Sequence, residues 1–588
     1  MPHITLDGQI IETTQGKSVI EAAYDNGIEI PHFCWHPELS VAGNCRMCLC
    51  EVGMPARTRE GELEKNEDGS QKINFIPKLQ IACATPVADG MVVKTKSAKA
   101  VEAQEAVMEF LLINHPLDCP ICDEAGECKL QDYAHRHSKG ESRFIEEKNH
   151  KLKHQEWGPN VVFDAERCIS CSRCIRIAKE VCDQDVLTFV QRGDHVTIEL
   201  FEGKVFDNPY SMNVIEACPV GALTSNDFRF KSRVWEMSFT DSISYADASG
   251  SNTRIGVRNN EILRIEPRTN MYVNKYWLTD DARLNHYDFV NNDRIVKPMM
   301  KTDGRLKEVT WDEANENAYD TLKSMDSSHI FFLASARATN EDNFAFKKFV
   351  KENFNSDNID YLPHIDESFA DDKLGTADRT PNAKGVESLG INSNGTVNRK
   401  NLIDNINSGK IKAVYMLEDN LNDYPELLSA LDKLDFLVVH SHNNNEISQK
   451  ANIVFPASTY AEIEGTYTNK DGRVQHFKPA LVTKENLRYM GLNMSRWDKF
   501  GAKNDRWTKH ENRGCRQTWR ILQDLSAKMR NEWNYKKSKD VFADLEANHS
   551  EFKGMDYKLL DEYQGLVLGK ADNPDPKLTN YISHVMHP

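Results

Sequence analysis

The pattern of apolar and polar residues near the N-terminus predicts a small domain of short elements. Apolar runs at 4–6 and 10–12 flank the turn Asp7-Gly8, which predicts two short strands joined by a tight turn. Residues 18–24 then repeat apolar side chains at helical spacing, so a short helix is expected there.

A longer helix is predicted over residues 100–113. Its apolar side would carry Val107, Phe110 and Leu111. The helix should end just before Pro116, because the residue that precedes a proline is pushed away from helical geometry.

The second half of the chain predicts an α/β layer. Strongly apolar runs at 330–333, 414–417 and 436–440 have the length and composition of buried strands, with helical patterns between them. The last hundred residues are polar, and no pattern assigns them to a layer.

Composition narrows the class of protein. The 588 residues correspond to about three to five domains at roughly 150 residues each, and 40% of them are hydrophobic, which excludes a disordered chain. The net charge of −16 weighs against a nucleic-acid partner. No run approaches the ~18 apolar residues that span a bilayer, and the first residues form neither a signal peptide nor a transit peptide. We therefore expect a soluble, intracellular chain without a membrane span.

The cysteines carry the candidate chemistry. There are 14, and all except Cys515 lie in the first 218 residues. Because an intracellular chain keeps its thiols reduced, such a cluster indicates metal binding rather than disulfides. The alternative is a scatter of buried cysteines that act as small hydrophobes. The spacings favour metal binding, because they form three sets of four ligands and leave over only Cys50, Cys182 and Cys515.

The first set follows C-x10-C-x2-C-x34-C and consists of Cys34, Cys45, Cys48 and Cys83. Plant-type [2Fe–2S] domains use a close pair of thiolates, one slightly upstream and one far along the chain. The ten-residue gap is wider than the plant spacing, and Cys50 competes with Cys48. The C-x2-C spacing favours Cys48, which leaves Cys50 as a structural thiol. A zinc site is the rival, although zinc knuckles usually come in pairs.

The second set, H-x3-C-x2-C-x5-C, includes a histidine: His115, Cys119, Cys122 and Cys128. A cubane needs four protein ligands, and His115 completes the three cysteines. A neutral imidazole in place of a thiolate removes one negative charge and raises the potential. His135 and His137 are alternative ligands, placed farther along a helix that should begin near Cys128.

The third set is half of a bacterial two-cluster ferredoxin pattern. Its ligands are Cys168, Cys171, Cys174 and Cys218, the last followed by proline. In such ferredoxins a second run supplies a second cluster. The corresponding positions here are Ala178, Asn208, Ser211 and Val214, so the second cluster should be missing.

Three runs that overlap these sets resemble the large iron–sulfur subunit, the bacterial G chain, of respiratory complex I, the NADH:quinone oxidoreductase. They are 32–37 (HFCWHP), 114–122 (NHPLDCPIC) and 216–223 (EACPVGAL). The resemblance implies that the first set holds a [2Fe–2S] cluster and that the other two hold [4Fe–4S] clusters. It implies an electron relay with no catalytic side chain, which electrons enter at the His115 set and leave through the Cys168 set.

The rest of the chain is similar to the molybdopterin-oxidoreductase domain of this family, through 455–462 (FPASTYAE), 464–469 (EGTYTN) and 471–475 (DGRVQ). Some relatives carry an extra cubane near the start of this region. The matching positions here are Ser244, Asp247, Ser251 and Thr279, and Cys515 lies far downstream. We therefore expect neither that cluster nor a molybdopterin.

These inferences define a multidomain α+β protein. A plant-type ferredoxin domain with a β-grasp-like fold is predicted over 1–99, and a His/Cys3 [4Fe–4S] segment over 100–140. A bacterial-ferredoxin-like domain is predicted over 141–235, and a degenerate α/β molybdopterin-oxidoreductase-like domain without a cluster over 236–588.

The function implied is electron transfer between other subunits of an ion-translocating enzyme. No G-x-G-x-x-G motif follows a strand and no P-loop is present, so NADH, flavin and quinone should bind elsewhere. The implied partners are a flavin- and NADH-binding subunit, a 2Fe–2S subunit and quinone-facing subunits, at the cytoplasmic face of a bacterial inner membrane. The alternatives are the large subunit of a formate dehydrogenase or a hydrogenase, which need further cysteines, and a zinc-stabilised scaffold.

Overall fold

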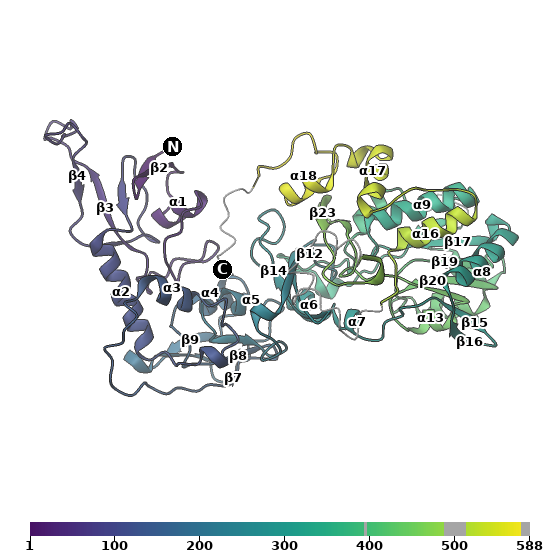
Figure 1. The fold of residues 1–588 in the computed structure, drawn as a ribbon, viewed down its shortest axis with the longest axis horizontal. Helices are drawn as coiled ribbons and strands as arrows, with labels where there is room; N and C mark the ends of the chain where they lie inside the picture. The colour runs from purple at the N-terminus through teal and green to yellow at the C-terminus, as the bar shows by residue number, and fades with distance from the viewer. Residues whose placement is uncertain (393–396, 487–512, 578–588) are drawn as a thin grey trace. The chain divides into compact units, whose positions relative to one another are not determined.

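The computed structural model describes residues 1–392, 397–486 and 513–577 (Figure 1). The chain divides into two compact units. Unit 1 is Met1–Trp235 and unit 2 is Glu236–Lys577. No helix in the described ranges is both long and apolar enough to span a bilayer.

Unit 1 begins with a mixed sheet in the order β2-β1-β6-β3-β4, in which β5 also pairs with β3. Its strands are β1 (His3–Leu6), β2 (Gln9–Glu12), β3 (Leu49–Pro55), β4 (Ile73–Phe75), β5 (Gln80–Ile81) and β6 (Val92–Lys94). The antiparallel pairing of β1 with β2 confirms the predicted hairpin. The predicted short helix is α1 (Val19–Asp25), which begins after Ser18 because the Ser18 side chain and Glu21 form a capping box.

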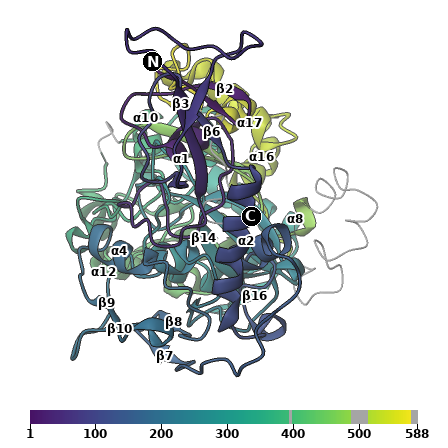
Figure 2. The same ribbon diagram turned by 90° about the vertical axis from the view of Figure 1, so that its left-hand side faces the viewer.

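The long helix is α2 (Ala98–Ile113), drawn lengthwise in Figure 2. It ends before Pro116 as predicted, but its predicted apolar side is only partly right, because Val107 and Leu111 are half-buried and Phe110 is not. The buried side chains are Ala100, Gln104 and Met108, whereas Phe110 is 75% exposed. Gln104 is buried because its side-chain amide donates to the carbonyl of Thr95, 3.2 Å away. A satisfied polar residue therefore lies on the inner face, and a large apolar residue lies outside.

The rest of unit 1 is built from short elements in two small sheets, β11-β8-β7 and β10-β9. The elements are η1 (Cys119–Ile121), α3 (Lys129–His137), β7 (Gln155–Glu156), β8 (Val161–Phe163), α4 (Arg173–Glu180), β9 (Leu187–Val190), η2 (Gly193–His195), β10 (Thr197–Leu200), α5 (Asn213–Ala217), β11 (Leu223–Ser225) and η3 (Val234–Glu236). Strands β8 and β11 pair antiparallel, and helices α4 and α5 contact each other.

Unit 2 is organised around a seven-stranded sheet in the order β16-β15-β21-β20-β19-β17-β18. Its strands are β15 (Met299–Thr302), β16 (Arg305–Glu308), β17 (Ile330–Ala334), β18 (Ile359–Tyr361), β19 (Ala413–Met416), β20 (Phe436–Ser441) and β21 (Ile453–Pro456). The five neighbouring strands β18, β17, β19, β20 and β21 are parallel to one another. The three runs predicted as buried strands are β17, β19 and β20, and the predicted α/β layer is confirmed.

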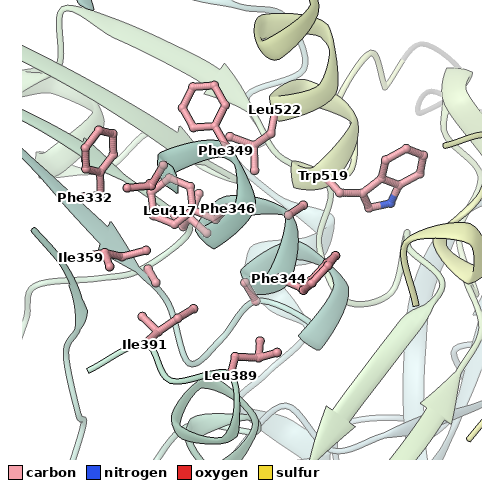
Figure 3. Close-up of a cluster of buried hydrophobic side chains, with 14 of the residues drawn as sticks. Phe332, Phe344, Phe346, Phe349, Ile359, Leu389, Ile391, Leu417, Trp519 and Leu522 are labelled. Atoms are coloured by element: carbon pink, nitrogen blue, oxygen red, sulfur yellow. The ribbon is translucent and has the colours of Figure 1, made fainter. Parts of the chain in front are cut away.

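Helices lie on both faces of this sheet, because alternate residues of each strand belong to different cores. In β17, Phe332 packs with residues of α8 and α9, whereas Phe331 packs with residues of α11 and α12. Figure 3 shows the first core, in which Phe346 and Phe349 of α9 lie near Leu522 of α16. A sheet buried on both faces explains why its strands are almost continuously apolar.

The remaining elements of unit 2 complete these layers and form two three-stranded sheets, β12-β13-β14 and β22-β23-β24. They are β12 (Ser238–Ile243), β13 (Asn252–Arg258), β14 (Glu261–Pro267), α6 (Asp280–Leu284), α7 (Asp288–Asn291), α8 (Trp311–Ser324), η4 (Ser327–His329), α9 (Asn340–Phe354), η5 (Glu367–Phe369), α10 (Ala383–Ser388), α11 (Leu402–Asn407), α12 (Pro425–Ala430), η6 (Leu431–Lys433), α13 (Glu446–Lys450), β22 (Gly465–Thr468), β23 (Arg473–Phe477), α16 (Thr518–Lys528), α17 (Ser538–Asn548), η7 (Ser550–Phe552), α18 (Tyr557–Glu562) and β24 (Leu566–Val567).

Candidate iron–sulfur centres

The first cysteine set lies on the loop between α1 and β3 and on the turn after β5. Cys34, Cys48 and Cys83 are each 1% exposed, and Cys45 is half-buried. The Cys34 thiol lies close enough to Cys45 and Cys83, and the Cys48 thiol close enough to Cys83, for these pairs to shift each other's pKa values. The structure therefore brings the four predicted ligands together, although they are separated by up to 34 intervening residues.

The surroundings of the first set explain two local features of the sequence. Gly43 has a φ of 63°, and a Cβ there would lie 3.1 Å from the Ile81 side chain, so glycine fits this turn. Cys50 is also buried, but its Sγ approaches the carbonyl of Gln80 at 3.6 Å. Burial, followed by the nearby Cys48, raises the pKa of Cys50 to about 12, which keeps it a thiol at neutral pH.

The second set follows α2. His115 comes directly after the C-cap residue Asn114, Cys119 begins η1, and Cys128 is the N-cap residue of α3. Cys122 is buried, Cys128 is half-buried and Cys119 is exposed. Electrostatic interactions join Cys122 to Cys119 and Cys128 to Cys122. The structure thus gathers the three thiols on one short stretch.

The protonation state of His115 suits a ligand. Burial, followed by the charges of Lys148 and Arg167, lowers the pKa of His115 to about 4, so its imidazole is neutral at neutral pH. Only a neutral imidazole can bind a metal. The two alternative ligands, His135 and His137, lie instead on helix α3. The ring of His137 packs against that of Tyr133, with 5.6 Å between the ring centres.

The third set lines a single pocket. Its four members are Cys168, Cys171, Cys174 and Cys218, and the pocket is closed by apolar side chains that include Ile198 and Val220. Cys174 lies in the first turn of α4, and Cys218 is the C-cap residue of α5. The two packed helices therefore deliver cysteines from distant parts of the chain to one cavity.

Burial opposes ionisation of the thiols that line this pocket. Burial, followed by the neighbouring Cys171, raises the pKa of Cys168 to about 12. Burial also raises the pKa of Cys174 and of Cys218 well above the usual thiol range. Thiols held this close in a dry site ionise together only if a positive centre compensates them, and metal binding supplies that compensation.

The backbone around these thiols is strained at two serines. Ser170 and Ser172 have φ values of 54° and 64°. These values lie in the left-handed region, which residues other than glycine rarely adopt. The N–H of Ser170 donates to Sγ of Cys168 at 3.3 Å. Such strain concentrates at functional sites, and hydrogen bonds to sulfur are one of the means by which proteins adjust cluster potentials.

The first and second sets each contact the third. The side chain of Asn44, beside Cys45, donates to the carbonyl of Ser170 at 3.1 Å. On the other side, the N–H of Lys129, beside Cys128, donates to the carbonyl of Pro219 at 3.1 Å. An added Cβ at Gly221 would lie 2.2 Å from Sγ of Cys122, so this close approach requires glycine.

Arginines at these contacts were missed by the sequence reasoning. Arg173 and Arg176 belong to α4, and their guanidinium groups bond backbone carbonyls of the first set's loop, at Trp35 and Cys34 respectively. The available signal was two basic residues around Cys174, at positions expected to be buried with it. Across the described residues, no three His, Cys, Asp or Glu side chains are placed to hold a single metal ion, so the proximity of the thiols in each set does not form a mononuclear metal site.

The positions of the extra cubane hold a hydrogen-bonded polar network in unit 2. Ser244, Asp247 and Ser251 are all buried. The Asp247 carboxylate accepts from the N–H of Ser249 at 3.0 Å, and the hydroxyls of Ser249 and Ser251 are 2.9 Å apart. Thr279 caps α6 by accepting from the N–H of Ala282. These groups satisfy one another and offer no thiolate, so they do not fit a [4Fe–4S] cluster.

The parallel strands of unit 2 also end in side chains that do not fit a molybdenum cofactor. After β19, Glu418 accepts a hydrogen bond from Thr518, which in turn meets His440 of β20 at 2.9 Å. Cys515 is fully buried with its Sγ 3.7 Å from the Glu462 carboxylate. Burial, followed by the Glu462 charge, raises the pKa of Cys515 to about 12, so it stays protonated and does not offer a thiolate to a metal.

Family models match both units. In unit 1 they are a 2Fe-2S iron-sulfur cluster binding domain (2–98), an NADH-ubiquinone oxidoreductase-G iron-sulfur binding region (104–143) and an NADH-quinone oxidoreductase subunit 3 ferredoxin-like domain (158–224). In unit 2 they are an NDSU1/NuoG-like 4Fe-4S domain (237–288) and molybdopterin oxidoreductase (294–384 and 382–489). By its fold and its cysteine sets, this chain is thus similar to the class of iron–sulfur subunits of NADH-quinone oxidoreductases.

Two individual proteins show the same similarity. The chain is 40% identical over 365 residues to the G-type subunit of the NADH-quinone oxidoreductase of Rickettsia bellii (strain RML369-C), covering 61% of this chain and 50% of the relative. It is 42% identical over 329 residues to the NADH-ubiquinone oxidoreductase 75 kDa subunit of Reclinomonas americana, covering 56% and 44%. The predicted resemblance to the large iron–sulfur subunit of complex I is confirmed.

The extent of the similarity is limited. The chain spans about half the length of these curated relatives. A chain in the crystal structure of an NAD+-reducing [NiFe]-hydrogenase in the H2-reduced state is 26% identical over 40% of this chain and 91% of its own. Its TM-score of 0.33 is too low for that likeness to bear on the fold.

Proposed function

We propose that this chain is an electron-transfer subunit of an NADH:quinone oxidoreductase that translocates ions. In this proposal the first set holds a [2Fe–2S] cluster, and the second and third sets hold one [4Fe–4S] cluster each. The observation that carries it is the convergence of the third set, Cys168, Cys171, Cys174 and Cys218, on one buried pocket. When bound, such clusters accept and release single electrons at potentials set by their surroundings.

The protein's own residues fit this role. Neutral His115 at the second set offers an imidazole nitrogen, and burial excludes water from the Cys34 and Cys174 thiols. The N–H of Ser170 donates to the Cys168 sulfur. These are means of setting a potential, and no group in this arrangement is needed to abstract a proton or to attack a substrate.

The contacts among the sets support an order for the relay. The third set contacts both the first, through Asn44, and the second, through Pro219 and Gly221. This arrangement favours a relay in which the third set stands between the other two. It does not support the order that the resemblance implies, in which electrons enter at the His115 set and leave at the Cys168 set, because the first set would then lie outside the route.

The partners and location follow from the same proposal. The chain would pass electrons from a subunit that binds flavin and NADH, beside a second 2Fe–2S subunit, toward subunits that face quinone. It would act as a peripheral subunit at the cytoplasmic face of a bacterial inner membrane. Unit 2 would serve as a scaffold that carries neither a cluster nor molybdopterin, since its polar positions pair with one another.

Removal of one ligand tests the proposal. The anaerobically purified chain should show three EPR signals after reduction. Cys218→Ala should lose one [4Fe–4S] signal and keep the other two, because only the third set includes Cys218. Cys182→Ala is the matched control, since Cys182 is a buried cysteine of unit 1 that lies outside the three sets, and it should keep all three signals. Three signals in Cys218→Ala, or zinc in place of iron, would refute the assignment.

A further inference from the structure

Arg173 occupies the boundary between the first and third sets. It is the first residue of α4 and is 3% exposed. One nitrogen of its guanidinium donates to the carbonyl of Trp35 at 2.6 Å, and another donates to the carbonyl of Ala217 at 2.9 Å. Trp35 follows Cys34 of the first set, and Ala217 precedes Cys218 of the third. One side chain therefore bridges the ligand loops of two sets.

The charge of Arg173 has no carboxylate partner. Within the described ranges, its hydrogen bonds go only to backbone carbonyls, and its Nε has no partner at all. Arg173 also lines the pocket formed by the four cysteines of the third set. A buried cation is costly unless an opposite charge compensates it, and the thiol groups of Cys171, Cys34 and Cys218 are the acidic groups that act on it.

We propose that Arg173 is a positioning residue whose buried charge raises the reduction potentials of the centres at both the first and the third set. The inference rests on the proposed function, because it requires redox centres at these sets. Each one-electron reduction adds one negative charge and takes up no proton, so a fixed cation nearby stabilises the reduced form. Because Arg173 bonds both loops, its effect is shared by two centres.

Two other arginines define the limits of this effect. Arg176, one helical turn along α4, bonds the carbonyls of Cys34 and Ser40 in the loop of the first set, and its charge also acts on Cys171 of the third set. Arg233 donates to the carbonyl of Cys122 at 2.7 Å and bonds that of Pro120, so it belongs to the second set. Arg233 is therefore a matched control: a guanidinium that bonds the carbonyl of a ligand residue, but of a different set.

EPR-monitored redox titration of the full, cluster-loaded chain with dithionite tests the proposal. Arg173→Gln should shift the first-set and third-set midpoints to more negative values and leave the second unchanged. Arg173→Lys keeps the charge, so its first-set and third-set midpoints should stay close to those of the unaltered chain. Arg233→Gln should lower only the second-set midpoint. Unchanged first-set and third-set midpoints in Arg173→Gln, or an equal shift in Arg173→Lys, would overturn the inference.

The outcomes separate this inference from the function on which it rests. If the unaltered chain shows no iron–sulfur signals, the proposed function fails. If all three signals are present and the Arg173→Gln midpoints do not move, only the role of Arg173 fails. If Arg173→Gln does not retain its clusters, Arg176→Gln decides: a lowered first-set midpoint supports buried cationic control at this boundary, and an unchanged one refutes it.

Discussion

Units 1 and 2 reach a folded state by different means. Unit 1 contains 13 of the 14 cysteines, and its strands are divided among sheets of six, three and two strands. Unit 2 contains one cysteine and a seven-stranded sheet with an apolar core on each face. Apolar burial therefore accounts for the fold of unit 2, whereas the loops of unit 1 bring cysteines from distant parts of the chain together.

The same contrast exists between two matched regions. The third set and residues 237–288 both match family models for iron–sulfur domains. In the third set, buried thiols surround a pocket. In the second region, Asp247 and Ser251 bond neighbouring polar groups. In residues 237–288 the polar side chains therefore satisfy one another, whereas the thiols of the third set surround a cavity.

Removal of iron should have the largest effect and should separate the two units. We expect limited proteolysis of the chelated, anaerobic chain to cut within 1–235 and to spare unit 2, because metal binding stabilises small metal-dependent domains by on the order of 10 kcal/mol. Mass spectrometry of the fragments measures this, with the untreated chain as the control. Equal cleavage of both units would contradict the comparison.

Truncation of a core side chain in unit 2 should destabilise unit 2 and leave unit 1 intact. Phe346 is fully buried, and its ring lies 5.7 Å from that of Tyr415. Phe346→Ala should destabilise unit 2 by about 3–5 kcal/mol in calorimetric unfolding, with the EPR signals of unit 1 unchanged. Phe369→Ala, at a side chain that is 42% exposed, is the control and should cost less than about 1 kcal/mol. Loss of EPR signals in Phe346→Ala would show that the units do not fold separately.

The imidazole of the second set should account for part of its potential. His115→Cys should keep a cubane but lower its midpoint by on the order of 100 mV, because the added thiolate adds negative charge. His135→Gln is the control and should leave all midpoints in place. A midpoint that stays or rises in His115→Cys would exclude His115 as the ligand.

The smallest effect concerns pH and unit 2 alone. Burial, followed by the neighbouring Asp342 carboxyl, raises the pKa of Glu418 from 4.5 to about 8. Between these values the folded state holds a proton that the unfolded state lacks, so stability falls as pH rises, by up to about 1.4 kcal/mol per pH unit.

Glu418→Gln should flatten this slope in denaturant titrations from pH 5 to 8. Gln is uncharged throughout the range, so the proton difference between the folded and unfolded states disappears at this position. The exposed Glu426→Gln should not change the slope. An unaltered slope in Glu418→Gln would show that this carboxyl is ionised in the folded state.

The main strands could be predicted from the sequence, and the candidate ligand sets proposed from it, because both depend on local signals. C-x2-C spacing identifies the close pairs in each set, and continuous apolar runs identify β17, β19 and β20. The buried face of α2 was predicted only in part, because the amide of Gln104 finds a partner in Thr95, which no periodicity reveals. The contact of the third set with the other two, and the role of Arg173, depend on loops that meet only in three dimensions.

The C-terminal region illustrates the same limit. Its polar composition gave no layer assignment, yet Trp519 and Leu522 of α16 and Phe542 of α17 are buried in the core beside α9. A few well-placed apolar residues on short helices sufficed, and their partners lie nearly two hundred residues earlier in the chain.

The central claim is that the three sets hold iron–sulfur clusters, and the most direct test is the iron and acid-labile sulfide content of the anaerobically purified chain. The account predicts about ten iron atoms and about ten sulfides per chain. One centre would hold about two of each, and each of the other two centres about four of each. A preparation that is colourless and metal-free after anaerobic reconstitution, or that contains only zinc, would contradict it.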